Sequence, residues 1–245
     1  MSEYKPLTCL PVLPLRGLVA FPEMLIHFDV GRLISMKALE QSMQDNQRLF
    51  LTAQRDIRTD APTTDDLFVV GTVCTVKQIL RLPGDNIRVL VEGSYRAGVE
   101  QFSKEDDGCM RARVFRMETE PGRVSERRKE ALVRALQDRF EEYAGLASQI
   151  TNDVVMTVLD GGEPGYLADY VAQNTPLAYE TKQELLEELH DVRRLERVVR
   201  VLGHEIEILQ IENSIQDKLK EQIDKNQKEY YLREQLKIIQ TELGD

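Results

Sequence analysis

The residues best suited to metal or redox chemistry are few, and their spacing supports neither a metal site nor a disulfide framework. The cysteines are odd in number and widely separated, with no C-x-x-C pair. His204-Glu205 begins like the zinc motif H-E-x-x-H, but Ile208 stands where the second histidine should be. We expect reduced, buried cysteines, and histidines at the surface or at helix ends. The residues concerned are Cys9, Cys74, Cys109, His27, His190 and His204.

Motifs for nucleotide binding and nucleophilic catalysis are missing as well. No Gly-Lys dipeptide occurs, which excludes a P-loop, and neither G-x-S-x-G nor G-x-G-x-x-G is found. Paired acids such as Asp65-Asp66 and Glu187-Glu188 are typical of solvated turns and helix faces. The sequence therefore predicts no catalytic, cofactor-binding or metal-binding residues, and it indicates a non-catalytic module for binding and assembly.

Charge and hydropathy disfavour two further classes of partner. The 245-residue chain carries 32 Lys and Arg against 42 Asp and Glu, a net charge of −10. Nucleic-acid phosphates need a basic surface, whereas this chain has a pI near 5.0. No apolar run reaches the roughly 18 residues of a membrane span, and the N-terminus lacks the apolar core of a signal peptide. We expect a cytoplasmic protein that binds neither nucleic acid nor membrane.

The elements that would position any binding site fall into two classes along the chain. Prolines and glycines are dense up to residue 122, which favours short strands and turns, and no proline follows Pro176. Residues 1–120 therefore read as a compact, barrel-like sheet domain around one short helix, on which Leu33, Met36, Leu39 and Met43 share a face. Strands are predicted over 8–15, 25–30, 49–53, 67–79, 87–91, 96–102 and 110–117.

A helical bundle is predicted over residues 121–190. Pro164 suits the first position of one helix, and Thr181 and Glu184 have the spacing of a capping box in another. Together with the sheet domain this makes an α+β fold. The predicted helices span 124–146, 152–159, 165–173 and 178–190.

One very long helix is predicted over 192–243, within a third unit at 191–245, with Asp191 as its N-cap. Only Gly203 interrupts it, and its length of roughly 75–80 Å exceeds what a globular domain needs. An apolar stripe between Leu195 and Leu209 should pack on the preceding helices. A coiled-coil seam at the far end has no evident partner and is a candidate for assembly. The residues of that tip are Tyr230, Tyr231, Leu232, Leu236, Ile239 and Leu243.

The order of several motifs resembles the N-terminal region of the Lon family of ATP-dependent proteases. The most specific match lies in the long helix, at 229–237 (EYYLREQLK) and 242–244 (ELG). The resemblance covers essentially the whole chain, although 103–125 matches poorly. The other matching segments are 11–16 (PVLPLR), 21–22 (FP), 30–32 (VGR), 67–72 (LFVVGT), 89–93 (VLVEG), 167–169 (LAD), 176–177 (PL) and 182–186 (KQELL).

This resemblance implies a PUA-like β-barrel, a helical bundle and a long helix leading towards a hexameric ring. It implies that the segment captures misfolded or regulatory proteins and supports hexamer assembly and coupling to the ATPase. The family's P-loop and Ser-Lys dyad have no counterpart in these residues, so ATP and Mg²⁺ are expected for the full-length parent and not for this segment. The alternative is a freestanding Lon-domain adaptor or receptor without protease activity.

Capture of unfolded proteins requires exposed, adaptable apolar side chains. Two groups of apolar residues are candidates, one at 21–25 beside the first strand and one at 80–83 at the predicted hairpin. The same residues could instead form the core of the barrel. We also expect self-association, as a hexamer in the full-length protein and as a possible dimer of the fragment through the helix tip. The candidates for protein binding are Phe21, Pro22, Met24, Leu25, Leu80, Leu82 and Pro83.

Overall fold

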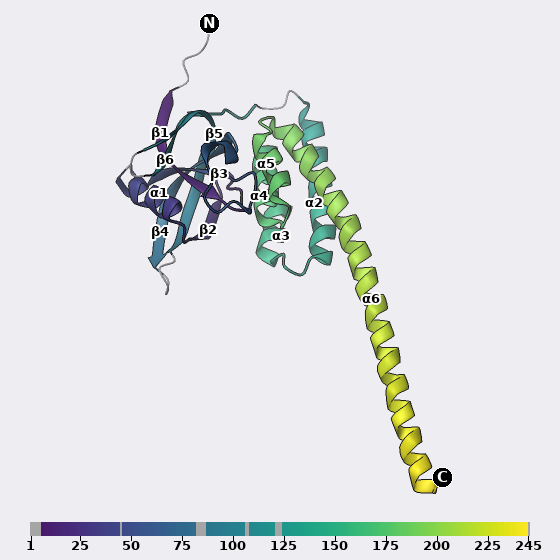
Figure 1. Ribbon diagram of the computed structural model, residues 1–245. Coiled ribbons are helices and arrows are strands. Elements are labelled where there is room, and N and C mark those ends of the chain that lie inside the picture. Colours follow the sequence, from purple (N-terminus) through teal and green to yellow (C-terminus); the bar gives the residue numbers. More distant parts are fainter. Residues whose placement is uncertain (1–5, 45, 82–86, 106–107, 121–123, 245) are drawn as a thin grey trace.

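The computed structural model describes residues 6–44, 46–81, 87–105, 108–120 and 124–244. A β-barrel packs against a bundle of helices, and one helix continues far beyond both (Figure 1). The predicted α+β fold with a barrel, a bundle and a very long helix is confirmed.

The barrel is built from one six-stranded sheet in the order β2-β5-β4-β3-β1-β6. Because β5 also pairs with β6, five strands close on themselves and β2 is left at an edge. Most strands are antiparallel, and β1 and β3 are parallel. The strands are β1 (Leu7–Leu15), β2 (Leu25–Val30), β3 (Arg48–Ala53), β4 (Val70–Arg81), β5 (Ile87–Lys104) and β6 (Met110–Arg116).

Strand β5 differs from the prediction, which divided it into two strands. It is one 18-residue strand that pairs with β2 over its first part and with β6 over its second. Glycines let this strand pass close to its neighbours. A Cβ at Gly93 would lie 2.1 Å from the Phe21 carbonyl oxygen, and one at Gly71 of β4 only 2.2 Å from that of Leu51. Gly71 thus permits close packing, whereas the register shifts of β4 fall at Val73/Cys74 and Val76/Gln78.

Helix α1 (Leu33–Gln44) packs along β1 and contributes Ala38 and Leu39 to a cluster of buried barrel residues. A short 3-10 turn, η1 (Thr64–Asp66), precedes β4. Two of the cysteines are buried as expected, but Cys9 is exposed, because its side chain points outward from β1.

The bundle consists of α2 (Glu126–Leu146), α3 (Asn152–Leu159), α4 (Pro164–Asn174) and α5 (Tyr179–Glu187). The Ser125 hydroxyl caps α2 by accepting a hydrogen bond from the Arg128 amide, and Pro164 occupies the first turn of α4 as predicted. The predicted capping box at Thr181 is wrong, because α5 begins at Tyr179 and places Thr181 inside the helix.

Helix α6 (Asp191–Leu243) is 53 residues long, about 80 Å at 1.5 Å per residue. His190, and not Asp191, is its N-cap residue, although the Asp191 carboxylate accepts a hydrogen bond from the Val192 amide. The predicted apolar stripe is confirmed, because its members are buried or half-buried against the bundle. The buried members are Leu195, Val198, Leu202 and Ile206, with Val199 and Leu209 half-buried.

Barrel and bundle share one apolar core. Val19, Phe21, Met24 and Ala53 of the barrel part belong to the same buried cluster as the inner faces of α2, α4, α5 and α6. The two parts therefore form one packed head, defined here as the barrel, α1–α5 and α6 up to Leu209.

Candidate functional site

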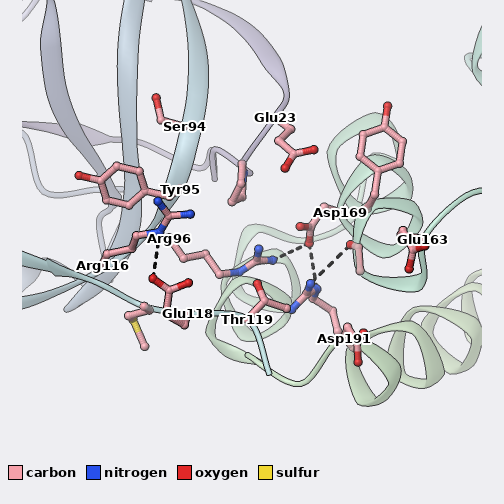
Figure 2. Close-up of a pocket in the computed structure, with 15 residues that line it drawn as sticks. Glu23, Ser94, Tyr95, Arg96, Arg116, Glu118, Thr119, Glu163, Asp169 and Asp191 are labelled. Atoms are coloured by element: carbon pink, nitrogen blue, oxygen red, sulfur yellow. Dashed lines mark hydrogen bonds and ion pairs between the residues drawn. The ribbon is translucent and has the colours of Figure 1, made fainter. Parts of the chain in front are cut away.

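A cavity of about 550 Å³ lies where the barrel meets the bundle. Side chains from β5 and from the segment after β6 line one side, and α4 and α6 line the other. Figure 2 shows Arg96 of the barrel pointing towards Asp169 of α4. The cavity is strongly charged, with three arginines and five carboxylates along its wall. These are Arg96, Arg116, Arg194, Glu23, Glu118, Glu163, Asp169 and Asp191.

Asp169 holds two buried guanidiniums at the bottom of this cavity. Arg96 Nη2 donates to Asp169 Oδ1 at 2.5 Å, and Arg194 Nε forms an ion pair with the same oxygen at 3.0 Å. Arg96 Nε also donates to the Leu186 carbonyl, so that β5, α4, α5 and α6 converge on one point. Burial lowers the pKa of the Arg194 guanidinium, and the Asp169 carboxylate opposes that shift.

Further polar contacts join the barrel and the bundle. The Tyr179 hydroxyl donates to the Arg55 carbonyl at 2.8 Å, and Gln183 Nε2 donates to the Val70 carbonyl at 3.0 Å. At the cavity wall, Arg116 Nε pairs with Glu118 at 3.2 Å. These contacts fix the barrel and the bundle to each other.

The contact of Arg96, Asp169 and Arg194, called here the Asp169 joint, was not predicted from the sequence. The signal was Asp169 itself, an ionisable residue on the apolar stripe of α4 between Leu167, Ala168 and Val171. A buried carboxylate in such a position requires a partner of opposite charge. The sequence does not reveal that the partners are Arg96 and Arg194, because they come from distant elements.

The structure places the predicted protein-binding residues in different environments. Phe21 and Met24 are buried, with 1% and 5% of their surface exposed, because they fill the shared core. Their predicted exposure is therefore wrong. Pro22 is half-buried, whereas Leu25 and Leu80 are exposed at 61% and 48%. Leu82 and Pro83 lie outside the described residues.

Leu25 and Leu80 share the outer face of the sheet but do not touch. Leu25 lies opposite Glu92 and Leu80 opposite Arg88 in the strand register, four residues or about 13 Å apart along β5. The half-buried Leu90 lies between these two positions on β5, and Arg88 and Glu92 on either side of it pair with Asp29 and Lys77, each at 2.6 Å. Of the two predicted groups, each thus contributes one exposed leucine to this face, among charged side chains.

The predicted tip of α6 is solvent-exposed along its whole length. All six predicted assembly residues expose more than half of their surface, and the Tyr231 hydroxyl accepts a hydrogen bond from Gln235 Nε2 of the next turn at 3.0 Å. Figure 1 shows this part of α6 extending away from the head. Within the described residues, no segment covers the seam.

Two absences concern only the part of the chain that the structure describes. In that part no group of three His, Cys, Asp or Glu side chains is arranged to hold a metal ion. In the same residues, no helix combines the length and the apolar character that a membrane crossing requires.

Comparisons with known proteins agree with this architecture. Residues 9–204 match the family model described as the ATP-dependent protease La (LON) substrate-binding domain. The chain is 43% identical over 236 residues to a Lon protease of Clostridium acetobutylicum and 42% identical to Lon protease 1 of Bacillus subtilis. Each alignment covers 96% of this chain but 30% of the relative, so the chain spans under a third of their length.

Solved structures give the same result for the fold. The N-terminal domain of a Mycobacterium avium complex Lon protease superposes with a TM-score of 0.64 at 18% identity, covering 82% of this chain and 98% of that one. A Lon N-terminal domain protein from Xanthomonas campestris gives a TM-score of 0.56 at 17% identity, covering 79% of this chain and 98% of that one. The chain belongs to the family of Lon protease substrate-binding domains.

Proposed function

We propose that this chain is the non-catalytic, client-binding region of a cytoplasmic Lon-type protease, and that it captures misfolded or regulatory proteins. The observation that carries this proposal is the match of residues 9–204 to a substrate-binding domain. The rigid joint at Asp169 supports it, because a receptor that passes clients onward needs a fixed geometry between its binding surface and its supporting helix.

Leu25 and Leu80 are the remaining candidates for client contact on the outer face of the barrel. Both are exposed, and apolar side chains surrounded by charges can bind many different unfolded chains weakly. The division of labour follows the predicted units: 1–120 contacts the client, 121–190 supports the barrel, and 191–245 connects to the rest of the enzyme.

Binding of the purified chain to one labelled protein, compared in its native and its permanently unfolded form, tests the proposal. We expect tighter binding of the unfolded form, and weaker binding by a Leu25→Ser/Leu80→Ser double variant. Met156→Ser, which alters an exposed methionine on α3, is the matched control. Equal binding of both forms, or none, would contradict client capture by this chain.

We further propose that distal α6, the part of the helix after Leu209, supports hexamer assembly. It also couples the head to an ATPase that uses ATP and Mg²⁺ in the full-length protein. Leu236 lies about 120° around α6 from Ile206, at 100° per residue. The seam therefore does not continue the face that packs on the bundle, and its partner approaches α6 from another side. An apolar seam at 4-3-4 spacing suits another helix.

The assembly role is tested with Leu236→Asp in the full-length enzyme. We expect looser hexamers or ATP hydrolysis that is uncoupled from proteolysis, because a carboxylate in a coiled-coil seam is poorly tolerated. Gln227→Asp introduces the same charge on the opposite side of α6, nine residues away, and serves as the control. Normal hexamers and normal proteolysis in the Leu236→Asp enzyme would refute the role.

A further inference from the structure

A second cavity, of about 540 Å³, opens at the side of the barrel beside the first turn of α1. Its wall is largely apolar, formed by Leu33 and Ile34 of α1, Ala61 and Pro62 of the loop after β3, and Met110 of β6. Leu33 is 72% exposed although it lies at the start of a packed helix. An exposed leucine beside a cavity of this size forms a binding site for an apolar side chain of a ligand.

The charges at this cavity are not balanced. Arg32 and Lys104 line it, and the one carboxylate in its wall, Asp60, is already paired with Arg16 at 2.7 Å. Lys104 has no ion-pair partner among the described residues. The pKa of the Arg32 guanidinium is lowered by burial and by the positive charge of Arg16, with Asp60 opposing. A carboxylate brought in by a ligand would complete the site.

Arg32 also lines a smaller cavity of about 360 Å³ between the end of β1 and strand β2. The two cavities thus share Arg32 as a lining residue. Arg32 is held in place, since Nη1 donates to Gln54 Oε1 at 2.5 Å and Nη2 donates to the Pro14 carbonyl at 2.7 Å. A ligand that fills both cavities must pass over Arg32.

The smaller cavity is bordered by an open strand edge. β2 pairs with β5 on one side only, and the Met24 carbonyl accepts from the Gly93 amide on that side. Because backbone groups alternate in direction along a strand, those of His27 and Asp29 point away from β5. His27 and Asp29 also line the smaller cavity. Such an edge is a template for an added strand.

We propose that an extended internal segment of a client protein binds across these two cavities, adding to the edge of β2 and placing an acidic side chain at Arg32 and a neighbouring apolar side chain against Leu33. The proposal rests on the proposed function of client capture. An internal segment fits better than a chain end, because a segment that fills both cavities continues past Arg32, which lines both. Backbone pairing supplies binding that tolerates many sequences, and the charge supplies selectivity.

The test uses the whole chain and fluorescent peptides of eleven residues, acetylated and amidated, with one central Glu flanked by Leu and Val. We expect the Glu peptide to bind about tenfold more tightly than its Gln counterpart, and Leu33→Asp and Lys104→Glu each to weaken binding about tenfold. Leu33→Asp should fold normally, because an acidic residue at the first position of a helix is favourable. Met156→Asp is the control.

Each other result overturns the proposal. Equal binding of the Glu and Gln peptides would show that the acidic side chain does not contribute to binding. Unchanged binding by Leu33→Asp would show that the peptide does not bind in the cavity beside Leu33. Tighter binding of a Gln peptide with a free C-terminal carboxylate would assign the site to chain ends. Self-association that Leu33→Asp abolishes would assign it to a second copy. If unfolded protein still binds while the peptides do not, client capture stands and this site fails.

Discussion

The head and the distal half of α6 are stabilised in different ways, although one unbroken helix runs through both. Up to Leu209 the helix buries one side chain per turn against the bundle, and Arg194 joins the ion pairs of Asp169. Next to Leu209, Gln210 Nε2 still donates to Glu142 Oε1 of α2 at 3.4 Å. Farther along α6, the side-chain hydrogen bonds and ion pairs of the described residues join residues three or four positions apart. Arg233 pairs with Glu229 at 2.6 Å and Lys237 with Glu234 at 2.7 Å, each within one turn.

Exposed pairs of this kind contribute only about 0.3–0.5 kcal/mol each. The distal helix is therefore held mainly by its own helix propensity, whereas the head is held by tertiary packing. This difference separates two roles along one element: the head fixes geometry, and the distal half remains available to a partner.

The largest effect is expected at the joint. Asp169→Asn keeps the size of the side chain but removes the carboxylate that pairs with both buried guanidiniums, which should lower the free energy of unfolding by about 3–5 kcal/mol. Urea denaturation followed by circular dichroism measures it. Asp138→Asn, an exposed acid on α2, should change little. A wild-type midpoint for Asp169→Asn would show that packing alone holds barrel and bundle together.

Lys182 of α5 provides a pH-dependent test of the head. Burial lowers its pKa to about 8, whereas the ordinary value is 10.5. The unfolded chain therefore binds more protons between these values, and stability should rise with pH across that window. We expect Lys182→Met to be about 1–3 kcal/mol more stable than wild type at pH 7, with the gap closing by pH 10.5. A gap independent of pH would contradict this origin.

Gly203 tests how far propensity contributes where α6 still contacts the bundle. A Cβ there meets no atom within 4 Å, so Gly203→Ala should stabilise the chain by about 0.5–1 kcal/mol. Gly71→Ala should have the opposite sign, because its Cβ would collide with the Leu51 carbonyl. The thermal unfolding temperatures of both variants test this. A Gly203→Ala variant that is less stable than wild type would contradict the expectation that helix propensity determines the effect at this position.

The smallest effect on the chain itself is expected at the tip. Leu236→Asp should leave the unfolding midpoint of the head within about 0.5 kcal/mol of wild type, because Leu236 contacts nothing in the head. Amide hydrogen exchange should be much faster around Leu236 than around Leu202 in both proteins. Equal protection of the two regions would mean that the distal helix is already partnered in the isolated chain.

Much of the fold could be predicted because the deciding signals are local. Alternation and turn residues located most strands, and the 3.6-residue stripe of α6 identified its buried face. The predicted break in β5 at 92–95 contains Gly93, a residue type common in turns, whereas in the structure Gly93 allows a close approach to the Phe21 carbonyl. The predicted exposure of Phe21 and Met24 is wrong because the sequence does not determine which apolar residues of a segment face the core. Only the packing of the barrel against the bundle buries these two.

The sequence by itself determined the composition class, the order of elements, the long helix and its two apolar faces, because each depends on residues within a few turns or one strand. The tertiary structure decided the rest. It brought Arg96, Asp169 and Arg194 together from three elements, buried Phe21 and Met24 between barrel and bundle, and made Arg32 part of the wall of two cavities. These are contacts across long stretches of chain, and they follow from how whole elements pack rather than from any local pattern.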